Sequence, residues 1–180
     1  MIFRLYLASL VLLLGTSCKK ERSPLEQLPA ATQSGANTMG CLVDGELFRP
    51  VSENYGIKPI SVSRFSTRDM DIAFTRQEDD AHRGIILFLD LVRGPGTYPL
   101  DQVARINFSG SPSYGYYKTY TPEPDRKYVT GPDVSGQVII TRLDTVAKVV
   151  AGTFEFTARQ LNGTATVRVT DGRFDLHYPQ

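Results

Sequence analysis

Apolar and polar residues alternate along most of the chain that follows Gly35. Between residues 70 and 75, Met, Ile and Phe alternate with Asp, Ala and Thr, and similar alternation recurs at 154–158 and 174–178. A period of two places successive side chains on opposite faces of a strand. Residues 85–92 read IILFLDLV, a nearly continuous apolar run that is typical of a central strand covered on both faces. The pattern predicts about eight to ten short strands and no amphipathic helix.

An Asp-Gly pair between two apolar runs predicts a tight hairpin near the start of this region. Asp44 and Gly45 separate residues 39–43 from residues 46–48. A two-residue turn of type I′ needs a positive φ at both central positions, which Asp-Gly tolerates well. The pairs that such a turn predicts are Val43–Glu46, Leu42–Leu47 and Cys41–Phe48.

The C-terminal part of the chain predicts a meander. The expected strands are 137–143, 149–160, 164–170 and 173–178. Asp171 and Gly172 give a second hairpin signal, between the last two of these strands. No repeat of fixed period is visible, which disfavours a propeller or a β-helix. We therefore expect an all-β fold over residues 36–180, a single antiparallel β-sandwich or open barrel.

The start of the chain predicts a signal peptide for export over residues 1–17. Arg4 is the only charged residue before Lys19, and residues 5–14 form an apolar run. Ten helical residues reach about 15 Å, roughly half of the hydrocarbon core of a bilayer, so a transmembrane helix is disfavoured. A basic start, a short apolar stretch and small residues after it are typical of a secretory signal.

The residues around Cys18 make this signal more specific. Gly15, Thr16 and Ser17 precede the cysteine, which resembles the bacterial lipoprotein signal, where cleavage occurs just before a cysteine. The resemblance implies a thioether-linked diacylglycerol on Cys18 and, usually, a third acyl chain such as palmitate on its amine. Leu14 stands one position further from the cysteine than the strictest pattern allows. The alternative is an ordinary secretory signal with a chance cysteine.

The segment after the anchor predicts a flexible tether. Two or three acyl chains would hold the protein on a membrane, because each buried methylene contributes about 0.8 kcal/mol and a single chain binds only reversibly. Residues 23–35 read SPLEQLPAATQSG, without a sustained period, so we expect residues 18–35 to be the lipidated cysteine and a tether. The alternative is a helical turn in which Leu25, Leu28 and Ala31 pack on the domain.

Composition and charge exclude two classes of protein. The chain has 180 residues, a formal net charge of +1, two cysteines and no tryptophan. A nucleic-acid-binding protein needs a basic face to neutralise phosphates, which this balance does not provide. Two cysteines cannot build a disulfide-rich scaffold, and lipidation of Cys18 would leave Cys41 without a partner. We interpret Cys41 as a small buried hydrophobe.

Residues that carry catalysis or bind metals are few. The two histidines, His82 in a polar stretch between strands and His177 facing outward, have no further histidine or cysteine at ligand spacing. Glu78, Asp79 and Asp80 would hold calcium only if backbone carbonyls completed the shell. Nucleophile elbows and phosphate-binding glycine loops are absent. The sequence therefore favours a protein that is no enzyme and has no cofactor or metal. A hydrolase with clustered, partly buried carboxylates in a cleft is the alternative.

Tyrosine is concentrated in residues 109–128. Five of the nine tyrosines of the chain fall in this segment. Tyrosine offers a rigid apolar face with a polar tip, which suits sugar rings and peptides. The segment is either a ligand or partner surface or a strand whose tyrosines pack across the sheet. The five residues are Tyr114, Tyr116, Tyr117, Tyr120 and Tyr128.

Three stretches resemble an uncharacterised domain family of Gram-negative lipoproteins. They are LPAATQSGANTMGCLVDGELFRP (28–50), GQVIITRLDTVAKVVAGTFEFTARQ (136–160) and VTDGRFDLHY (169–178). The resemblance implies a lipid-anchored all-β domain and supplies no activity and no catalytic residues. Within the second stretch, Asp144-Thr145-Val146 matches a short O-glycosylation pattern of some Gram-negative exported proteins.

Together these observations predict a lipid-anchored lipoprotein of the cell envelope. We expect it on the outer membrane, and the domain faces either the periplasm or the cell surface. The β domain would have a binding or structural role, with the membrane as partner through Cys18 and a glycan, a peptide or an envelope protein as a further partner. The alternative is a barrel or sandwich that holds a small ligand or glycan with residues 109–128. No nucleic-acid partner is expected.

Overall fold

The computed structural model describes residues 22–53, 56, 58–64, 69–78, 81–104, 112–121 and 125–178. The predicted signal peptide and Cys18 lie outside the described residues. Within the described parts of the chain, no helix is long and apolar enough to cross a membrane. One short 3₁₀ turn, η1 (Leu25–Gln27), precedes the strands. The strands are β1 (Thr38–Val43), β2 (Glu46–Phe48), β3 (Val51–Ser52), β4 (Ile60–Arg64), β5 (Met70–Glu78), β6 (Ala81–Leu89), β7 (Gly96–Pro99), β8 (Tyr114–Thr121), β9 (Arg126–Val129), β10 (Gly136–Asp144), β11 (Val149–Gln160) and β12 (Thr166–His177).

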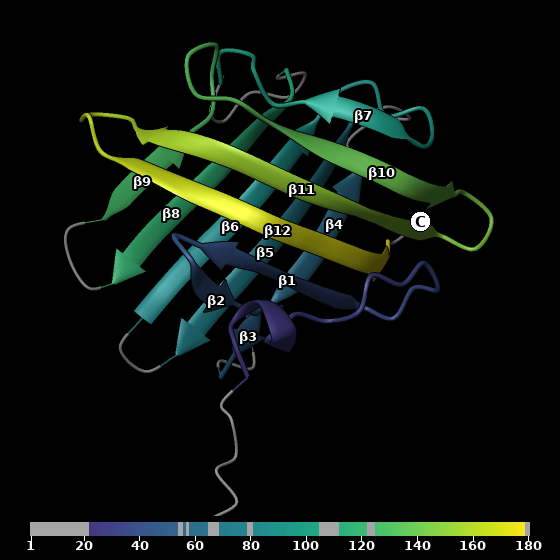
Figure 1. The fold of residues 1–180 in the computed structure, drawn as a ribbon. Coiled ribbons are helices and arrows are strands. Elements are labelled where there is room, and N and C mark those ends of the chain that lie inside the picture. The colour runs from purple at the N-terminus through teal and green to yellow at the C-terminus, as the bar shows by residue number, and fades with distance from the viewer. Residues whose placement is uncertain are drawn as a thin grey trace, which may run out of the picture.

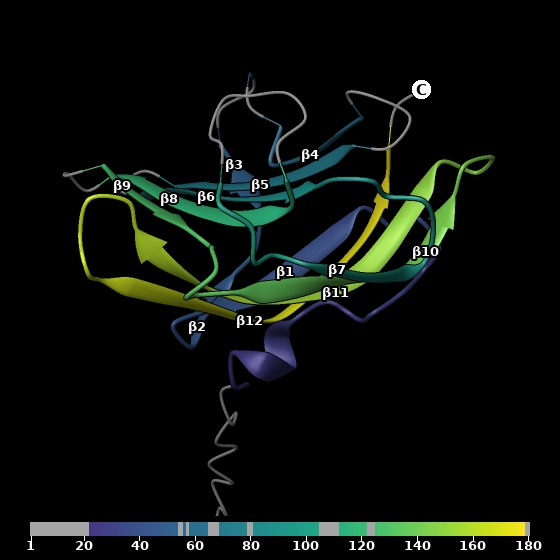
Figure 2. The same cartoon turned by 90° about the horizontal axis from the view of Figure 1, so that it is seen from above.

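The strands form two layers that face each other (Figure 1) (Figure 2). The front layer has the order β7-β10-β11-β12-β1-β2, and the back layer has the order β9-β8-β6-β5, with β3 and β4 both paired to β5. The layers join where Arg159 and Gln160, at the end of β11, pair with β9. On the other side, β2 leads into β3 through Arg49 and Pro50. The sheet is therefore curled into an open barrel flattened like a sandwich, which confirms the predicted all-β class.

Two details differ from the predicted fold. β3 pairs with β5 in parallel, whereas the longer ladders, such as β5–β6 and β11–β12, are antiparallel. The described residues also contain more strands than predicted, because β3, β7 and β9, of two, four and four residues, are not expected from the sequence. Their sequences, VS, GTYP and RKYV, show no alternation of apolar and polar residues that would predict a strand.

The predicted hairpin at Asp44-Gly45 is confirmed. Asp44 has a φ of 50° and Gly45 a φ of 86°, so both central positions lie in the left-handed region. The observed pairs between β1 and β2 are the predicted ones, Cys41–Phe48, Leu42–Leu47 and Val43–Glu46.

The second Asp-Gly pair does not form a turn, so the predicted hairpin at Asp171-Gly172 is wrong. β12 continues through it from Thr166 to His177, between β1 and β11. Asp171 has a φ of 55°, and the register of β12 shifts there against both neighbours, which marks a β-bulge. A residue with a positive φ, such as Asp171, can lie in a β-bulge as well as in a tight turn. The predicted four-stranded meander is therefore the three strands β10, β11 and β12.

Apolar side chains from both layers fill the space between them. Phe74 of the back layer stacks on Phe154 of the front layer, with ring centroids 5.9 Å apart. Cys41 is fully buried, and burial raises the pKa of its thiol, which confirms the interpretation of Cys41 as a core residue. Other fully buried apolar side chains in this core are Phe48, Met70, Ile72, Ile85, Leu87, Leu100, Ile140 and Leu176.

The chain before β1 lies against the front layer, and residues 22–37 are here called the N-terminal strap. Leu28 is buried, and Pro29 packs over Gly40 of β1. Residues 22–35 therefore do not form the flexible tether that their composition predicts. The alternative helical turn exists as η1, but Leu25 and Ala31 are exposed and only Leu28 of the three packs on the domain.

Candidate functional site

The five tyrosines predicted as a ligand surface do not share one surface. Tyr117 and Tyr128 belong to the core, where their ring centroids lie 5.8 Å apart. Tyr114 and Tyr116 lie on the opposite face of β8, yet they are only 1% and 9% exposed. Tyr120, at 37%, is the single exposed member of the set. The structure therefore contradicts a common tyrosine surface and supports the alternative, in which the tyrosines pack across the sheet.

Neighbouring rings and burial explain the state of these phenols. Tyr114 stacks on Phe88 of β6, with ring centroids 4.3 Å apart. Burial, and then the nearby charge of Asp71, raise the pKa of Tyr114. Burial, followed by the proximity of Tyr120, raises the pKa of Tyr116 to about 12. Both phenols therefore stay protonated beyond the pH at which a free tyrosine ionises, and they act as packing groups.

Tyr120 contacts two polar side chains. Its ring stacks on His82, with centroids 4.1 Å apart, and the Nζ of Lys118 lies 3.7 Å from the ring centroid. Lys118 also forms an ion pair with Asp125 at 3.0 Å. His82 thus lies within β6 and packs on a tyrosine, whereas the sequence predicted a polar stretch between strands. His177 is exposed near the end of β12, as predicted.

Three carboxylates gather where β5 begins and β6 ends. Burial, and then the negative charge of Asp69, raise the pKa of Asp71 to about 6. Burial also raises the pKa of Asp90, and a hydrogen bond with Asp69 adds to the rise. None of the three lines the surface depressions described below. In the part of the chain that the structure describes, no three His, Cys, Asp or Glu side chains are placed to hold a metal ion. Asp79 and Asp80, which the calcium alternative needs, lie outside the described residues.

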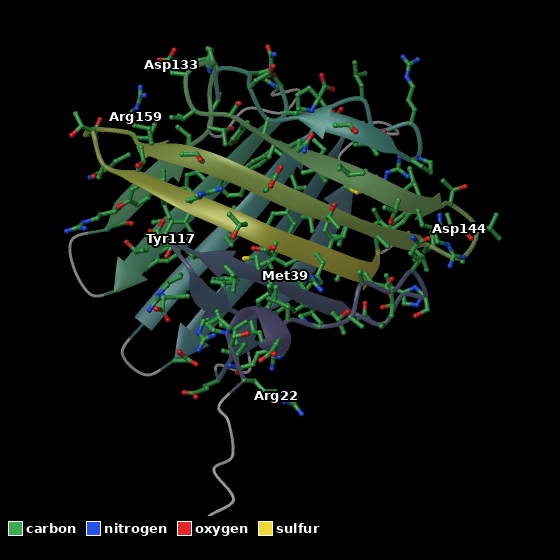
Figure 3. All side chains as sticks on the ribbon, viewed as in Figure 1. Arg22, Met39, Tyr117, Asp133, Asp144 and Arg159 are labelled. Carbon is green, nitrogen blue, oxygen red and sulfur yellow. The ribbon has the colours of Figure 1, made fainter. Side chains whose placement is uncertain are left out.

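The Asp144-Thr145-Val146 motif begins the turn between β10 and β11 (Figure 3). Val146 is 92% exposed, and Thr145 is exposed beside it. Asp144 Oδ1 accepts hydrogen bonds from the N–H groups of Val146 and Ala147 at 2.9 and 2.8 Å. The hydrogen bond from Arg142, and then these N–H groups, lower the pKa of Asp144. The threonine hydroxyl is thus on an accessible turn, and its glycosylation stays a prediction.

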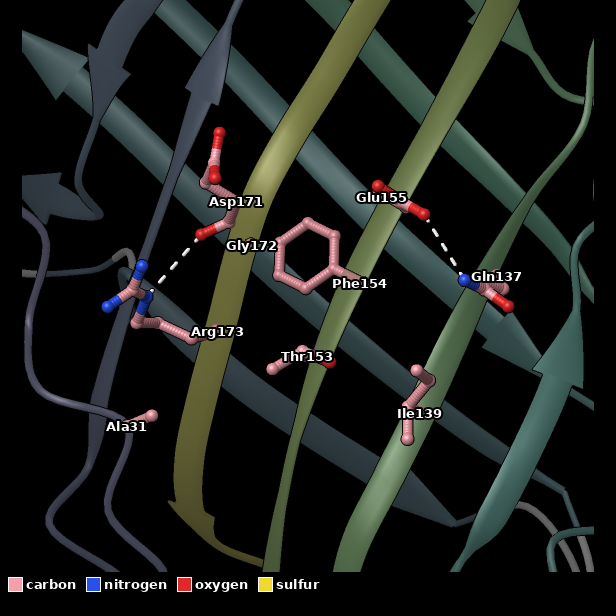
Figure 4. A pocket seen from close by; sticks show the side chains of 9 residues that line it. All are labelled: Ala31, Gln137, Ile139, Thr153, Phe154, Glu155, Asp171, Gly172 and Arg173. Carbon is pink, nitrogen blue, oxygen red and sulfur yellow. Dashed lines mark hydrogen bonds between the residues drawn. The ribbon is translucent and has the colours of Figure 1, made fainter. Parts of the chain in front are cut away.

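A shallow depression of about 450 Å³ lies on the outer face of the front layer (Figure 4). Gly172 packs directly on Phe154 in its floor, since a Cβ at this position would lie 2.5 Å from the carbonyl oxygen of Phe154 and 2.6 Å from its ring. Gln137 Nε2 donates a hydrogen bond to Glu155 Oε1 at 3.2 Å, which ties β10 to β11 across the surface. The lining residues are Ala31, Gln137, Ile139, Thr153, Phe154, Glu155, Asp171, Gly172 and Arg173.

Two neighbouring depressions extend this surface. One of about 400 Å³ shares Gln137 and Glu155 with it, and one of about 560 Å³ shares Glu155 and Asp171. Arg168 lines both neighbours. We call Gln137, Glu155, Arg168, Asp171 and Arg173 the polar band. Their carboxylate, guanidinium and amide groups can hydrogen-bond a polar ligand, and no histidine or cysteine lines these three depressions.

Asp175 of β12 is a buried carboxylate, only 1% exposed, that holds the N-terminal strap. Its oxygens accept hydrogen bonds from the N–H groups of Ser34, Gly35 and Ala36 at 2.9, 2.7 and 3.1 Å. The hydroxyl of Thr32 donates at 2.6 Å, and that of Ser34 at 3.3 Å. Burial by itself would raise the pKa of Asp175, but the hydrogen bonds from Thr32 and the three N–H groups lower it to about 2. The carboxylate is therefore charged at neutral pH, and its ligand is the strap of its own chain.

Two arginines of the front layer hold the strap as well. Arg173 Nη1 donates a hydrogen bond to the carbonyl of Pro29 at 3.3 Å. Arg142 Nη1 donates to the carbonyl of Gln33. These contacts and the buried Leu28 add to the attachment at Asp175, which remains the main one because its carboxylate accepts five hydrogen bonds from residues 32–36.

The comparisons with known proteins identify a family and no activity. No curated protein and no solved structure matches the chain. The family model of a domain of unknown function, DUF6252, matches residues 80–175, which hold β6 to β11 and most of β12. The match includes residues 136–160, one of the stretches that carry the resemblance, and it leaves out residues 28–50. Because the match covers more than half of its length, the chain belongs to the DUF6252 family of domains of unknown function.

Proposed function

We propose that this protein is a lipid-anchored lipoprotein of the Gram-negative cell envelope, carried by the outer membrane, whose β domain binds a partner and catalyses no reaction. The anchor is supported by the apolar run at residues 5–14 and by the small residues that precede Cys18. The burial of Cys41 adds support, because a thiol enclosed in the core is no disulfide partner for Cys18. Acylation then accounts for the cysteine at this position.

The binding role is carried by one observation, the polar band on the outer face of the front layer. Its side chains lie on three long neighbouring strands, in which β11 pairs with β10 on one side and with β12 on the other. Groups held on a rigid sheet bind with little loss of conformational entropy. The depressions are shallow, and beside the exposed Ala31 and Ile139 they present acids, arginines and amides, whereas peptides bind best where deeper apolar pockets accept their side chains. We therefore propose a glycan as the ligand class.

The anchor is tested by membrane fractionation of the wild type and of Cys18→Ser. We expect the wild type in the membrane fraction and resistant to salt and carbonate washes. The variant is expected in the soluble fraction of the envelope, because without acyl chains the domain has only a small net charge to hold it. A Cys18→Ser protein that stays in the washed membranes would contradict the anchor.

The ligand is tested on arrays of envelope glycans with the double variant Glu155→Ala and Asp171→Ala. We expect the wild type to bind a subset of glycans and the variant to lose at least about tenfold in affinity, since each lost charged hydrogen bond is worth about 1.5–3 kcal/mol. Asp133→Ala is the matched control, because Asp133 is an exposed acid outside the polar band. Binding of peptides instead of glycans would reassign the ligand class, and binding of neither would contradict the role.

A further inference from the structure

The N-terminal strap limits how far the domain can lie from its lipid anchor. This argument rests on the proposed acylation of Cys18. Four residue steps separate Cys18 from Arg22, the first described residue, and an extended chain of that length spans about 14 Å. If the chain were free up to the first residue of β1, Thr38, twenty steps would span about 70 Å. Because the hydrogen bonds to Asp175 hold the strap on the domain, the segment between the anchor and the domain is short, about 14 Å and not about 70 Å.

The strap also determines which part of the domain lies beside the anchor. η1 sits on the outer side of the front layer, next to the edge formed by β1 and β2 (Figure 1) (Figure 2). A depression of about 570 Å³ brings Arg22 of the strap together with Arg49, which follows β2. Glu26, Gln27 and Leu28 complete its lining. The first described residue and this edge of the sheet thus form one local surface.

The side chains of this surface have the chemistry of a membrane contact. Arg22 and Arg49 are both exposed, and guanidinium groups bind phosphates through paired hydrogen bonds. Leu25 is a large apolar side chain that is 50% exposed. The turn that presents it is fixed, because Ser23 N–H donates to Glu26 Oε2 at 2.9 Å and Glu26 N–H donates to Ser23 Oγ at 3.3 Å.

We propose that Arg22, Leu25 and Arg49 form a membrane-contact surface that rests on the headgroups of a bilayer containing anionic phospholipids. Lys19 and Lys20 precede this surface in the sequence, and although Glu21 follows them, residues 19–22 carry a net positive charge next to the anchor. Glu26 is the opposing charge within the depression, and its carboxylate already accepts the Ser23 N–H. The acyl chains supply the affinity for the membrane, and the membrane-contact surface determines how the domain is oriented on it.

The orientation is tested with the acylated full chain in phosphatidylethanolamine–phosphatidylglycerol vesicles that contain brominated lipids. Single cysteines are introduced as Leu25→Cys or Leu161→Cys and labelled with a fluorophore, which is selective because Cys41 is buried. Leu161 is the matched control, since it is 43% exposed and lies in the turn between β11 and β12. We expect several-fold stronger quenching at position 25 than at position 161. Equal quenching at both positions, or none at position 25 in protein that floats with the vesicles, would overturn the proposal.

The charge contribution is tested with the double variant Arg22→Gln and Arg49→Gln, labelled at position 25. With Arg22 and Arg49 in place, quenching of the label at position 25 is expected to fall when phosphatidylglycerol is replaced by phosphatidylcholine, and this dependence should disappear in the double variant. Quenching that ignores lipid charge in both proteins would overturn the role of the two arginines. Protein that fails to float with vesicles at all would contradict the acyl anchor itself, which distinguishes failure of the proposed function from failure of this inference.

The role of the strap is tested with a label on the body of the domain, at Arg49→Cys. In the background of Asp175→Ala the strap should detach, so quenching of this label is expected to fall several-fold. Circular dichroism of the same sample shows whether the β domain remains folded, and the label at position 161 reports any general tumbling. Unchanged quenching at position 49 in a folded Asp175→Ala protein would overturn the claim that the strap sets the distance.

Discussion

Replacement of Asp175 by alanine should detach the N-terminal strap and lower the stability of the domain. The pKa of this carboxyl is about 2 in the folded protein against an ordinary 3.8, and at about 1.36 kcal/mol per pKa unit the difference corresponds to about 2 kcal/mol. Removal of the side chain also deprives the N–H groups of Ser34, Gly35 and Ala36 of their acceptor. We therefore expect Asp175→Ala to lower the free energy of unfolding by about 2–4 kcal/mol.

Urea unfolding at pH 7 measures this loss, and hydrogen exchange of residues 30–37 reports the strap directly. The folded-state pKa of Asp175 lies below its unfolded value, so its contribution is complete above about pH 4 and is lost as the pH falls through 2. The stability difference between the wild type and the variant should therefore shrink by about 2 kcal/mol between pH 7 and pH 2. Asp133→Ala is the control, because this acid has an 80% exposed side chain and should change stability by less than about 0.5 kcal/mol. If Asp175→Ala is as stable as the control at pH 7 and keeps the strap protected, the hydrogen bonds to Asp175 do not hold the strap.

Three further predictions concern the domain itself. Asp71→Asn should raise the free energy of unfolding at pH 8 by about 1 kcal/mol and have no effect at pH 4, because the raised folded-state pKa of about 6 makes the charged form unfavourable; a pH series of urea melts measures this. Gly172→Ala should cost at least about 2 kcal/mol by the same melts, since its Cβ would meet the Phe154 carbonyl oxygen at 2.5 Å, whereas Gly94→Ala has open space and should be nearly neutral. Cys41 should react with a thiol reagent only in denaturant, and rapid labelling of the native protein would contradict its burial.

The sequence predicts the fold well where local and tertiary preferences agree. At Asp44-Gly45 both residues have a positive φ and the two flanking apolar runs pair with each other, so the two-residue turn also predicts the register. Asp171-Gly172 carries the same local signal with a different outcome. There, β1 and β11 pair with β12 on both sides, and this tertiary pairing keeps the strand continuous and leaves a bulge.

The surface features are much less predictable from the sequence. Asp175 lies between Phe174 and Leu176 in an alternating strand, a position that normally faces water, and nothing local indicates that it is covered by residues 32–36. The composition of residues 32–36 is typical of a loop, and it does not indicate that their N–H groups share one acceptor. For the tyrosine segment the sequence suggests a binding surface where most of the side chains are buried. Aromatic residues that are suited to binding are equally suited to packing on a sheet.

Intact mass spectrometry of the protein purified from membranes shows whether Cys18 carries the anchor. We expect a mature chain that begins at Cys18 and carries the mass of a diacylglyceryl group, usually with one additional acyl chain. Enzymatic removal of ester-linked acyl chains should lower the mass by two fatty acids. A chain that retains residues before Cys18, or that begins there with a free thiol, would contradict the anchor.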